Sequence, residues 1–245
     1  GDVKNGAVWT DGKLGPALRF DGSNDCVSMG DVELVTSNKL SMSLWAKFTA
    51  SQAGYNIIAG KVLNSLNYSI YIDSIQNTKV RFVIDQWNNG GLSNTAMNDG
   101  RWHHYVGVYN GATTKLYVDG ILQTTTGATT GNIPNTGDGL TIGGASTNCG
   151  QPFAGSVDEV RLYNRALGGN DVTKLYAAGL GKIESAQSEK ASGLVGHWKF
   201  DDRRGLGAVD WSGNANTGTL SGGALWDQGK LGGAVSRDGT DDKVL

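Results

Sequence analysis

Proline, charge of one sign and long apolar runs are all scarce in this sequence. Only 3 of the 245 residues are proline, and the formal net charge is −2 at pH 7. A nearly neutral chain without a block of lysine and arginine does not favour nucleic acid or an anionic membrane surface as a partner. No apolar run approaches the roughly 20 residues that span a bilayer, so we expect no membrane insertion.

Glycine is abundant instead, with 38 residues. Glycine without proline, placed between short runs of β-branched and aromatic residues, predicts many tight turns in an all-β protein. A chain of this length can form one large domain or two small ones.

The two cysteines, Cys26 and Cys149, are far apart in the sequence. They are either two buried thiols or a disulfide that closes a long loop in an extracellular protein. Such a loop contributes ~4–5 kcal/mol in the chain-entropy model. We predict the disulfide, since neither cysteine belongs to a metal-binding or redox motif.

Residues 98–120 (NDGRWHHYVGVYNGATTKLYVDG) predict a β-hairpin. Apolar and aromatic residues alternate at period two along the first strand, and Asn110-Gly111 is suited to the turn. On the returning strand Leu116 and Val118 are expected to face the core. The side chains expected to point outward are His103, Tyr105, Tyr109, Lys115 and Tyr117.

Further short strands are predicted on both sides of this hairpin, at the spacing of a sandwich. They cover residues 17–21, 26–29, 40–46, 56–61, 68–73, 80–85, 121–124, 140–143 and 153–163. One short helix is predicted at residues 169–178, with Asn170 as its N-cap and Gly179 closing it.

Four segments resemble the laminin G-like jelly rolls of the concanavalin A-like lectin/glucanase superfamily. They are LSMSLWAKF, the WHH…YNG…KLYVDG pattern of the hairpin, LTIGG, and FAGSVDEVRLYNRAL. The resemblance implies a two-sheet antiparallel jelly-roll sandwich in residues 1–179. It also implies that this domain lacks its usual first strand.

The polar stretch at residues 180–192 is interpreted as a linker, and residues 193–245 as the start of a second repeat. GALWDQGKLGGAVSRDGTDDKV matches GAVWTDGKLGPALRFDGSNDCV at a constant offset, for example 226 − 9 = 217 for the tryptophans. Arg237 replaces Phe20 and Lys243 replaces Cys26, so the second copy is less suited to burial.

Residues 194–200 (LVGHWKF) have the pattern of the missing first strand. A sheet that lacks a strand leaves unpaired N–H and C=O groups, which recruit another strand. We therefore expect residues 194–200 to complete the first domain's sheet, in the same chain or in a neighbouring one, which would produce self-association. The alternative is that a second, truncated domain simply begins at Gly193.

Catalysis has little support in the sequence. A retaining glycosidase needs two carboxylates about 5 Å apart, and the glucanases of this fold carry them on one strand. The corresponding strands here have no such run, and Asp73 and Asp85 end strands, where aspartate commonly starts a turn. We therefore predict that the chain is not an enzyme, with a polysaccharide-degrading enzyme as an alternative.

Glycan binding has more support. If Val80, Phe82 and Ile84 point inward, then Arg81 and Asp85 point outward, and Trp87 follows in the next loop. Aromatic rings beside charged and amide groups are suited to sugars. The predicted ligand-binding residues are Arg81, Asp85, Trp87, Tyr105 and Tyr117. The alternative is an ordinary solvated sheet face.

A structural calcium ion is the expected cofactor. The resemblance places it at Asp158 and at Asp201, in the repeated first strand. The loop from Asp21 to Asp25 is a second acidic candidate, since calcium takes several oxygen ligands. The alternative for each residue is turn capping or an ordinary surface carboxylate.

These observations together predict a non-catalytic binding module at the cell surface or outside the cell. Its expected partner is a glycan or an extracellular protein. The alternative is a structural or adhesive repeat that self-associates by strand exchange.

Overall fold

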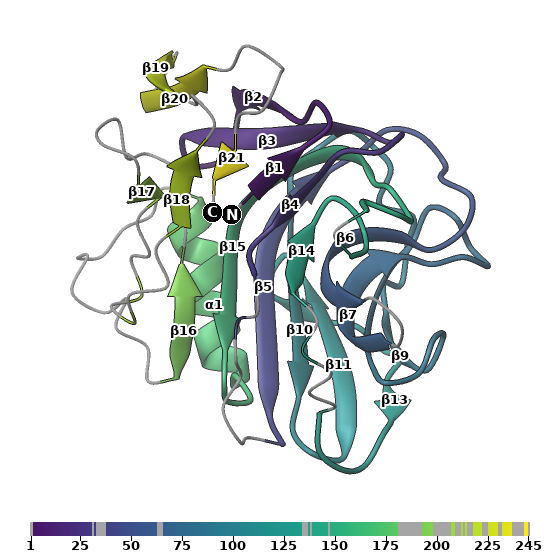
Figure 1. Cartoon of the computed structure of the whole chain (residues 1–245). Helices are drawn as coiled ribbons and strands as arrows, with labels where there is room; N and C mark the ends of the chain where they lie inside the picture. The colour runs from purple at the N-terminus through teal and green to yellow at the C-terminus, as the bar shows by residue number, and fades with distance from the viewer. Residues whose placement is uncertain are drawn as a thin grey trace.

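The structure is a computed structural model that places most of the first 180 residues and shorter stretches thereafter. It describes residues 2–30, 32, 38–62, 66–133, 137, 139–146, 148–180, 193–197, 207–208, 212, 214, 218–221, 225–229, 232–236 and 243–244. Two antiparallel sheets pack face to face (Figure 1). This confirms the predicted jelly-roll sandwich.

The first sheet has seven strands, in the order β1-β4-β14-β6-β7-β8-β9. They are β1 (Asp2–Lys4), β4 (Cys26–Ser28), β14 (Leu140–Ile142), β6 (Asn56–Val62), β7 (Leu66–Ile72), β8 (Val80–Ile84) and β9 (Gly90–Leu92). The disulfide between Cys26 and Cys149 joins β4 to the loop after β14, with 5.3 Å between the Cα atoms.

The second sheet has nine strands. Seven follow the order β12 (Ile121–Leu122), β11 (Thr113–Val118), β10 (His103–Tyr109), β5 (Leu40–Lys47), β15 (Ala154–Tyr163), β3 (Pro16–Asp21) and β2 (Val8–Asp11). In addition, β13 (Gly127–Ala128) pairs with β11, and β16 (Leu194–His197) pairs with β15.

The main core lies between the two sheets. In β5, Leu40, Met42, Leu44 and Ala46 point into it, while Trp45 lies on the outer face. In β8, Val80, Phe82 and Ile84 point inward. The inward orientations predicted for these strands are confirmed.

Gly107 in β10 shows how closely the sheets approach. A Cβ atom there would lie 2.2 Å from the ring of Phe82 on the facing sheet. Only glycine leaves room for that ring.

The orientation predicted for β10 is wrong. Tyr105 and Tyr109 belong to the main core, whereas Val106 and Val108 pack on the outer face with the helix. Both faces of this strand are buried, so alternation alone could not tell the inside from the outside.

Helix α1 (Gly169–Gly179) covers the outer face of the nine-stranded sheet. Its existence was predicted, but its N-cap is Gly168 rather than Asn170. Asp171 Oδ2 accepts a hydrogen bond from the Gly168 N–H at 3.1 Å, which provides the cap from inside the first turn. A Cβ atom on Gly179 would lie 2.2 Å from the Trp45 ring, so the helix ends in direct contact with that indole.

Strand β15 has a different neighbour along each half of one edge. Its first half pairs with β3, and its second half pairs with β16, with Leu162 opposite Gly196. Val195 packs against the main core. The prediction for this strand extended to residue 200, and residues 198–200 lie outside the described residues, as do 181–192.

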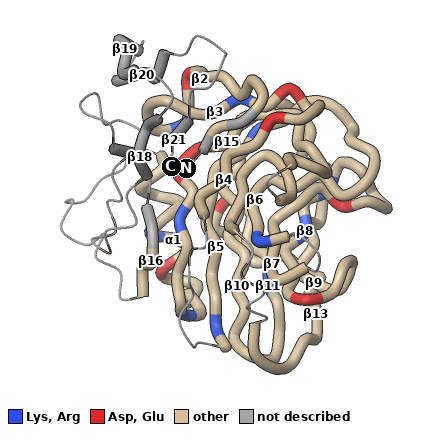
Figure 2. Tube along the Cα trace, viewed as in Figure 1, with Lys and Arg blue, Asp and Glu red and all other residues tan. Residues whose placement is uncertain are grey.

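The remaining described strands follow β16. They are β17 (Gly207–Ala208), β18 (Gly218–Ser221) and β21 (Lys243–Val244) in one small sheet, and the hairpin of β19 (Leu225–Gly229) and β20 (Gly232–Ser236). No helix among the described residues is long and apolar enough to cross a bilayer. Basic and acidic positions are scattered along the described trace (Figure 2).

Candidate functional site

Three aromatic rings gather on the outer face of the seven-stranded sheet. The centroid of the Trp87 ring lies 4.4 Å from that of Tyr55 and 5.1 Å from that of Tyr71, in an edge-on arrangement with the latter. Tyr71 is fully buried, whereas Tyr55 and Trp87 are partly exposed. We call Tyr55, Tyr71, Trp87 and Asn88 the Trp87 cluster.

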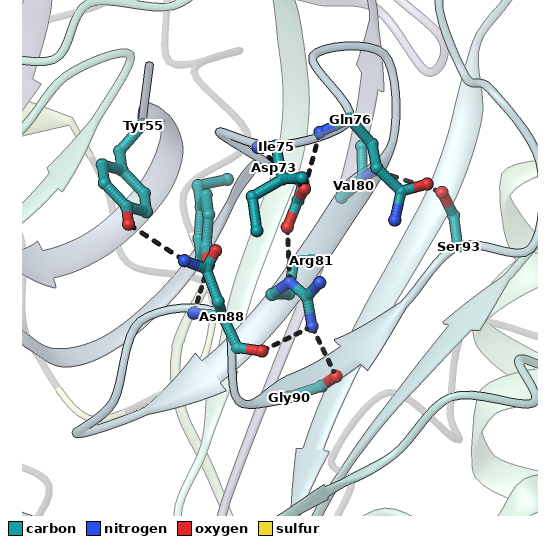
Figure 3. A network of polar contacts seen from close by, with 10 residues as sticks. Tyr55, Asp73, Ile75, Gln76, Val80, Arg81, Asn88, Gly90 and Ser93 are labelled. Carbon is teal, nitrogen blue, oxygen red and sulfur yellow. Dashed lines mark hydrogen bonds and ion pairs between the residues drawn. The ribbon is translucent and has the colours of Figure 1, made fainter.

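Asn88 anchors the loop of Trp87 to the two tyrosines, and Figure 3 shows its contact with Tyr55. Its side-chain Nδ2 donates to the Tyr55 hydroxyl at 3.0 Å, and its backbone N–H donates to the Tyr71 hydroxyl at 3.0 Å. Burial raises the pKa of Tyr71 above its usual value, so its hydroxyl stays protonated and donates to Asn88 Oδ1 at 3.4 Å. The hydrogen bonds of Asn88 therefore fix the position of the neighbouring Trp87.

Arg81 holds the same loop through hydrogen bonds to its backbone. Its Nε donates to Asp73 Oδ2 at 2.6 Å, and its Nη1 donates to the carbonyls of Asn88 and Gly90 at 2.9 and 3.2 Å. The Arg81 side chain is 9% exposed and that of Asp73 is 0% exposed. Arg81 points to the outer side as predicted, but its guanidinium positions the 85–89 loop within the protein.

Asp85 stands at the start of that loop with a positive φ of 59°. Its side chain is exposed, as is that of Gln86. Gln86 Oε1 accepts a hydrogen bond from Asn89 Nδ2 at 3.0 Å. An exposed carboxylate and an exposed amide side chain thus immediately precede Trp87 in this loop.

Two of the predicted ligand-binding residues lie elsewhere. Tyr105 is 0% exposed in the main core, so a ligand cannot reach its ring. Tyr117 lies on the outer face of the other sheet, packed with Val106 beside α1. The structure brings together Arg81, Asp85 and Trp87, and separates them from both tyrosines.

Sequence reasoning missed Tyr55, Tyr71 and Asn88. The alternation in YSIYID does place Tyr71 on the side opposite Ile70 and Ile72, and this signal was available. Tyr55 and Asn88 lie outside the strands, where no periodicity exists to reveal their direction.

The two adjacent histidines have opposite environments. His103 Nδ1 lies 2.7 Å from Asp119 Oδ2, and its Nε2 lies 3.1 Å from Asp99 Oδ1. The hydrogen bond to Asp119 is the main reason that the pKa of His103 is raised. Both ring nitrogens are occupied by carboxylates, which favours a structural role.

His104 is buried on the outer face of the nine-stranded sheet, and its Nε2 lies 2.8 Å from the Ser43 hydroxyl. Burial lowers the pKa of His104 to about 3, so the ring is neutral at pH 7. Its ring centroid lies 5.1 Å from that of Trp45.

The two predicted calcium sites have different surroundings. Asp158 Oδ2 accepts the backbone N–H groups of Lys13 and Leu14 at 2.7 and 2.9 Å, which is the bonding of a turn cap. Burial raises the pKa of Asp158 to about 7, against the charge that a cation requires. Asp201 lies outside the described residues.

Asp21 and Asp25 do lie together. Asp25 is 2% exposed, and its Oδ2 accepts the Asp21 N–H at 2.9 Å. Its Oδ1 is buried without a hydrogen-bond partner within the described part of the chain. Within that same part, no three His, Cys, Asp or Glu side chains are close enough together to hold a metal ion.

A family model agrees with this architecture. The model described as the concanavalin A-like lectin/glucanases superfamily matches residues 21–173, more than half of the chain. The chain belongs to this superfamily. A search of curated protein sequences found no match.

Solved structures with similar folds include sugar-binding domains. Domain 4 of an extracellular arabinanase from Geobacillus stearothermophilus, solved with arabinotriose, is 24% identical with a TM-score of 0.56 and covers 71% of this chain and 82% of its own. A putative carbohydrate-binding protein from Bacteroides ovatus is 16% identical with a TM-score of 0.60, covering 90% of this chain and 58% of its own.

The receptor-binding domain of botulinum neurotoxin type G is 12% identical with a TM-score of 0.52. It covers 72% of this chain and 45% of its own. At these identities the similarity establishes the fold of this superfamily member.

Proposed function

We propose that this chain is a non-catalytic carbohydrate-binding module of an extracellular or surface protein, with its glycan site at the Trp87 cluster. The observation that carries the proposal is Trp87 itself, a partly exposed ring fixed by Tyr55 and by the bonds of Asn88. A fixed aromatic ring stacks on the C–H face of a sugar with little loss of side-chain entropy. The exposed side chains of Asp85 and Gln86 would form hydrogen bonds with sugar hydroxyls.

Two further observations support this proposal. The arabinanase domain was solved with a trisaccharide, which makes pentose oligosaccharides a sensible first probe. The Cys26–Cys149 disulfide is typical of proteins in oxidising compartments, which supports the extracellular location.

A glycan array followed by calorimetry tests the site. We expect Trp87→Ala to lower the affinity for the bound glycan about fivefold or more, because a stacked ring contributes ~1 kcal/mol or more. Tyr117→Ala is the matched control, since it removes a partly exposed aromatic ring from the opposite sheet. Unchanged affinity in Trp87→Ala, with a native melting curve, would refute this site.

The same mixtures test the enzymatic alternative. We expect no new reducing ends after long incubation of the bound oligosaccharide with the protein. Steady turnover would show that the module is catalytic.

Self-association by strand exchange is the second candidate function, because β16, which pairs with β15 of its own chain, can pair in the same way with β15 of a neighbouring chain. Leu194 packs with the outer cluster and Val195 with the main core, so the start of this short strand is partly buried on both of its faces. The hairpin of β19 and β20 also repeats the register of β2 and β3, since Trp226 pairs with Val235 as Trp9 pairs with Leu18. Tandem copies that exchange this strand would form a chain of modules.

Truncation after Ser192 tests strand exchange. We expect the shortened chain to be less stable, and a peptide of residues 193–204 to restore its stability. Light scattering across concentration then separates a self-paired monomer from an exchanged assembly. Equal stability of the truncated and full chains would be incompatible with a role for this strand.

A calcium ion at Asp21 and Asp25 also stays a proposal, supported by the buried and unpartnered Asp25 Oδ1. Because a ligand that binds only the native state stabilises it, millimolar calcium should raise the melting temperature relative to a chelator. Asp25→Asn should abolish that difference. An identical melting temperature in both conditions would rule the ion out.

A further inference from the structure

A transverse row of residues crosses the outer face of the nine-stranded sheet near the ends of β3, β15 and β5. The register pairs Arg19 with Ser156 and Ser156 with Lys47. Their sequence neighbours Leu18, Phe20, Val157, Ala46 and Phe48 point into the core, so the row points outward. Adjacent strands lie about 4.8 Å apart, which places the Cα atoms of Arg19 and Lys47 roughly 10 Å apart with a serine between them.

A groove of about 400 Å³ lies over this row. Its lining includes Arg19, Ser156 and Lys47, together with Thr49, Gly100 and Asp21. Asp21 is its one acidic group, and its Oδ1 accepts the Ser23 N–H at 2.7 Å within its own turn. The charged lining therefore has an excess of one positive charge.

Within the part of the chain that the structure describes, both cations in this groove lack a carboxylate partner. Arg81, Arg101, Arg161 and Arg165 each form an ion pair with an aspartate or glutamate. Among the described residues, neither Arg19 nor Lys47 has an ion pair with an acidic side chain. The Lys47 ammonium instead lies 4.9 Å from the centroid of the Trp102 ring, which is partly exposed.

We propose that this groove binds the acidic group of an anionic saccharide, a sugar unit that carries a carboxylate or a sulfate. A guanidinium presents two parallel donors to such a group, and an ammonium about 10 Å away on the same face adds a second charge. Ser156, the small residue between the two cations in the register, is itself buried. Trp102 lies outside this lining, where its ring contacts the Lys47 ammonium.

The choice of a saccharide as the carrier rests on the glycan-binding function proposed above, whereas the preference for an anion does not. The groove and the Trp87 cluster lie on opposite sheets. Each can therefore fail without the other.

Calorimetry of the full chain tests the preference for an anion. The probes are a uronic-acid oligosaccharide, a sulfated oligosaccharide, a neutral oligosaccharide of the same length, and sodium sulfate alone. We expect at least one acidic oligosaccharide to bind about tenfold tighter than the neutral one, and added salt to weaken that binding. The carboxylate and sulfate arms show which acid is preferred. Equal affinity for neutral and acidic oligosaccharides would overturn the proposal.

Three variants locate the binding. The double variant Arg19→Gln/Lys47→Gln should lose about tenfold or more in affinity for the acidic probe. Ser156→Asp should do the same with both cations still present, because it places a carboxylate between them. Lys115→Gln, a change of the same kind on the outer face of the same sheet, should have no effect. A loss with Lys115→Gln equal to that of the double variant would mean non-specific charge attraction and would overturn the site.

Trp87→Ala separates this proposal from the first. This variant should lower the affinity for neutral glycans and leave the preference for acidic over neutral oligosaccharides unchanged. If the double variant binds the acidic probe as tightly as the unaltered chain, the groove is not the site, whatever Trp87→Ala does.

Discussion

The outer faces of the two sheets are covered in different ways. On the seven-stranded sheet, a loop and two tyrosines close over the Arg81–Asp73 ion pair and leave Trp87 partly exposed. On the nine-stranded sheet, helix α1 covers Trp45 and the neutral His104, and Asp158 is buried nearby under the β2–β3 turn.

This difference separates two kinds of buried polar group. Asp73 is buried with a cation and with two backbone N–H donors, so its charge is compensated. Asp158 is buried with N–H donors and beside Glu159, so burial dominates its pKa. The first arrangement builds a rigid platform for a ring, and the second makes stability depend on pH.

Removing Arg81 should have the largest effect. Arg81→Met leaves the fully buried Asp73 carboxylate without its cation, which costs ~3–5 kcal/mol of unfolding free energy in comparable cases. Urea denaturation measures the loss. The double variant Asp73→Asn/Arg81→Met should recover much of it, because no charge is then left unpaired. A loss under ~1 kcal/mol in the single variant would show that this ion pair does not support the platform.

The second largest effect should be the change of stability with pH. The folded pKa of Asp158, about 7, lies above its ordinary value of 3.8, so the native state binds more protons between these two values. Stability should therefore fall as pH rises from 4 to 7, with a slope of at most ~1.4 kcal/mol per pH unit.

Asp158→Asn isolates this contribution. Its melting temperature should vary less than that of the unaltered chain over pH 4–7. The pKa of His103 is also raised, and it should be raised in both proteins. The stability of both should therefore fall further as pH rises through that pKa. Identical pH profiles for the two proteins would show that Asp158 is already charged throughout.

A substitution at the contact between helix α1 and the sheet should have a smaller effect on stability than the two changes above. Gly179→Ala places a methyl group against Trp45, and overpacking of this kind costs ~1–3 kcal/mol. Gly169→Ala, in the first turn of the same helix, meets no atom within 4 Å and should not destabilise the protein. Thermal melts of both variants provide the comparison. Equal melting temperatures would mean that α1 shifts freely over the indole.

The smallest effect is expected at the exposed start of the helix. Arg165 Nη1 lies 2.8 Å from Asp171 Oδ2, with side chains 29% and 38% exposed. Ion pairs of this kind contribute ~0–1 kcal/mol, so Arg165→Ala should change the midpoint of unfolding only slightly and less at high salt. A loss as large as that of Arg81→Met would remove the distinction between buried and exposed pairs.

The fold class and most of the strands follow from the sequence alone. The alternation in β5 and β8 indicated the correct inward residues, because each strand has one clearly apolar set. In β10 both sets are apolar or aromatic, since the helix buries the outer face as well, and the prediction for Tyr105 was wrong for that reason. The helix itself was predicted, but not the strand face that it covers.

The residues that share a site become apparent only from the folded chain. Trp87 and Asp85 were identified from their own strand and loop, whereas Tyr55 and Tyr71 reach the same place from separate segments. The row of Arg19, Ser156 and Lys47 exists only because three strands distant in sequence pair in one register. Periodicity tells which side of a strand a residue occupies, but the neighbour across the sheet depends on pairing that local sequence does not encode.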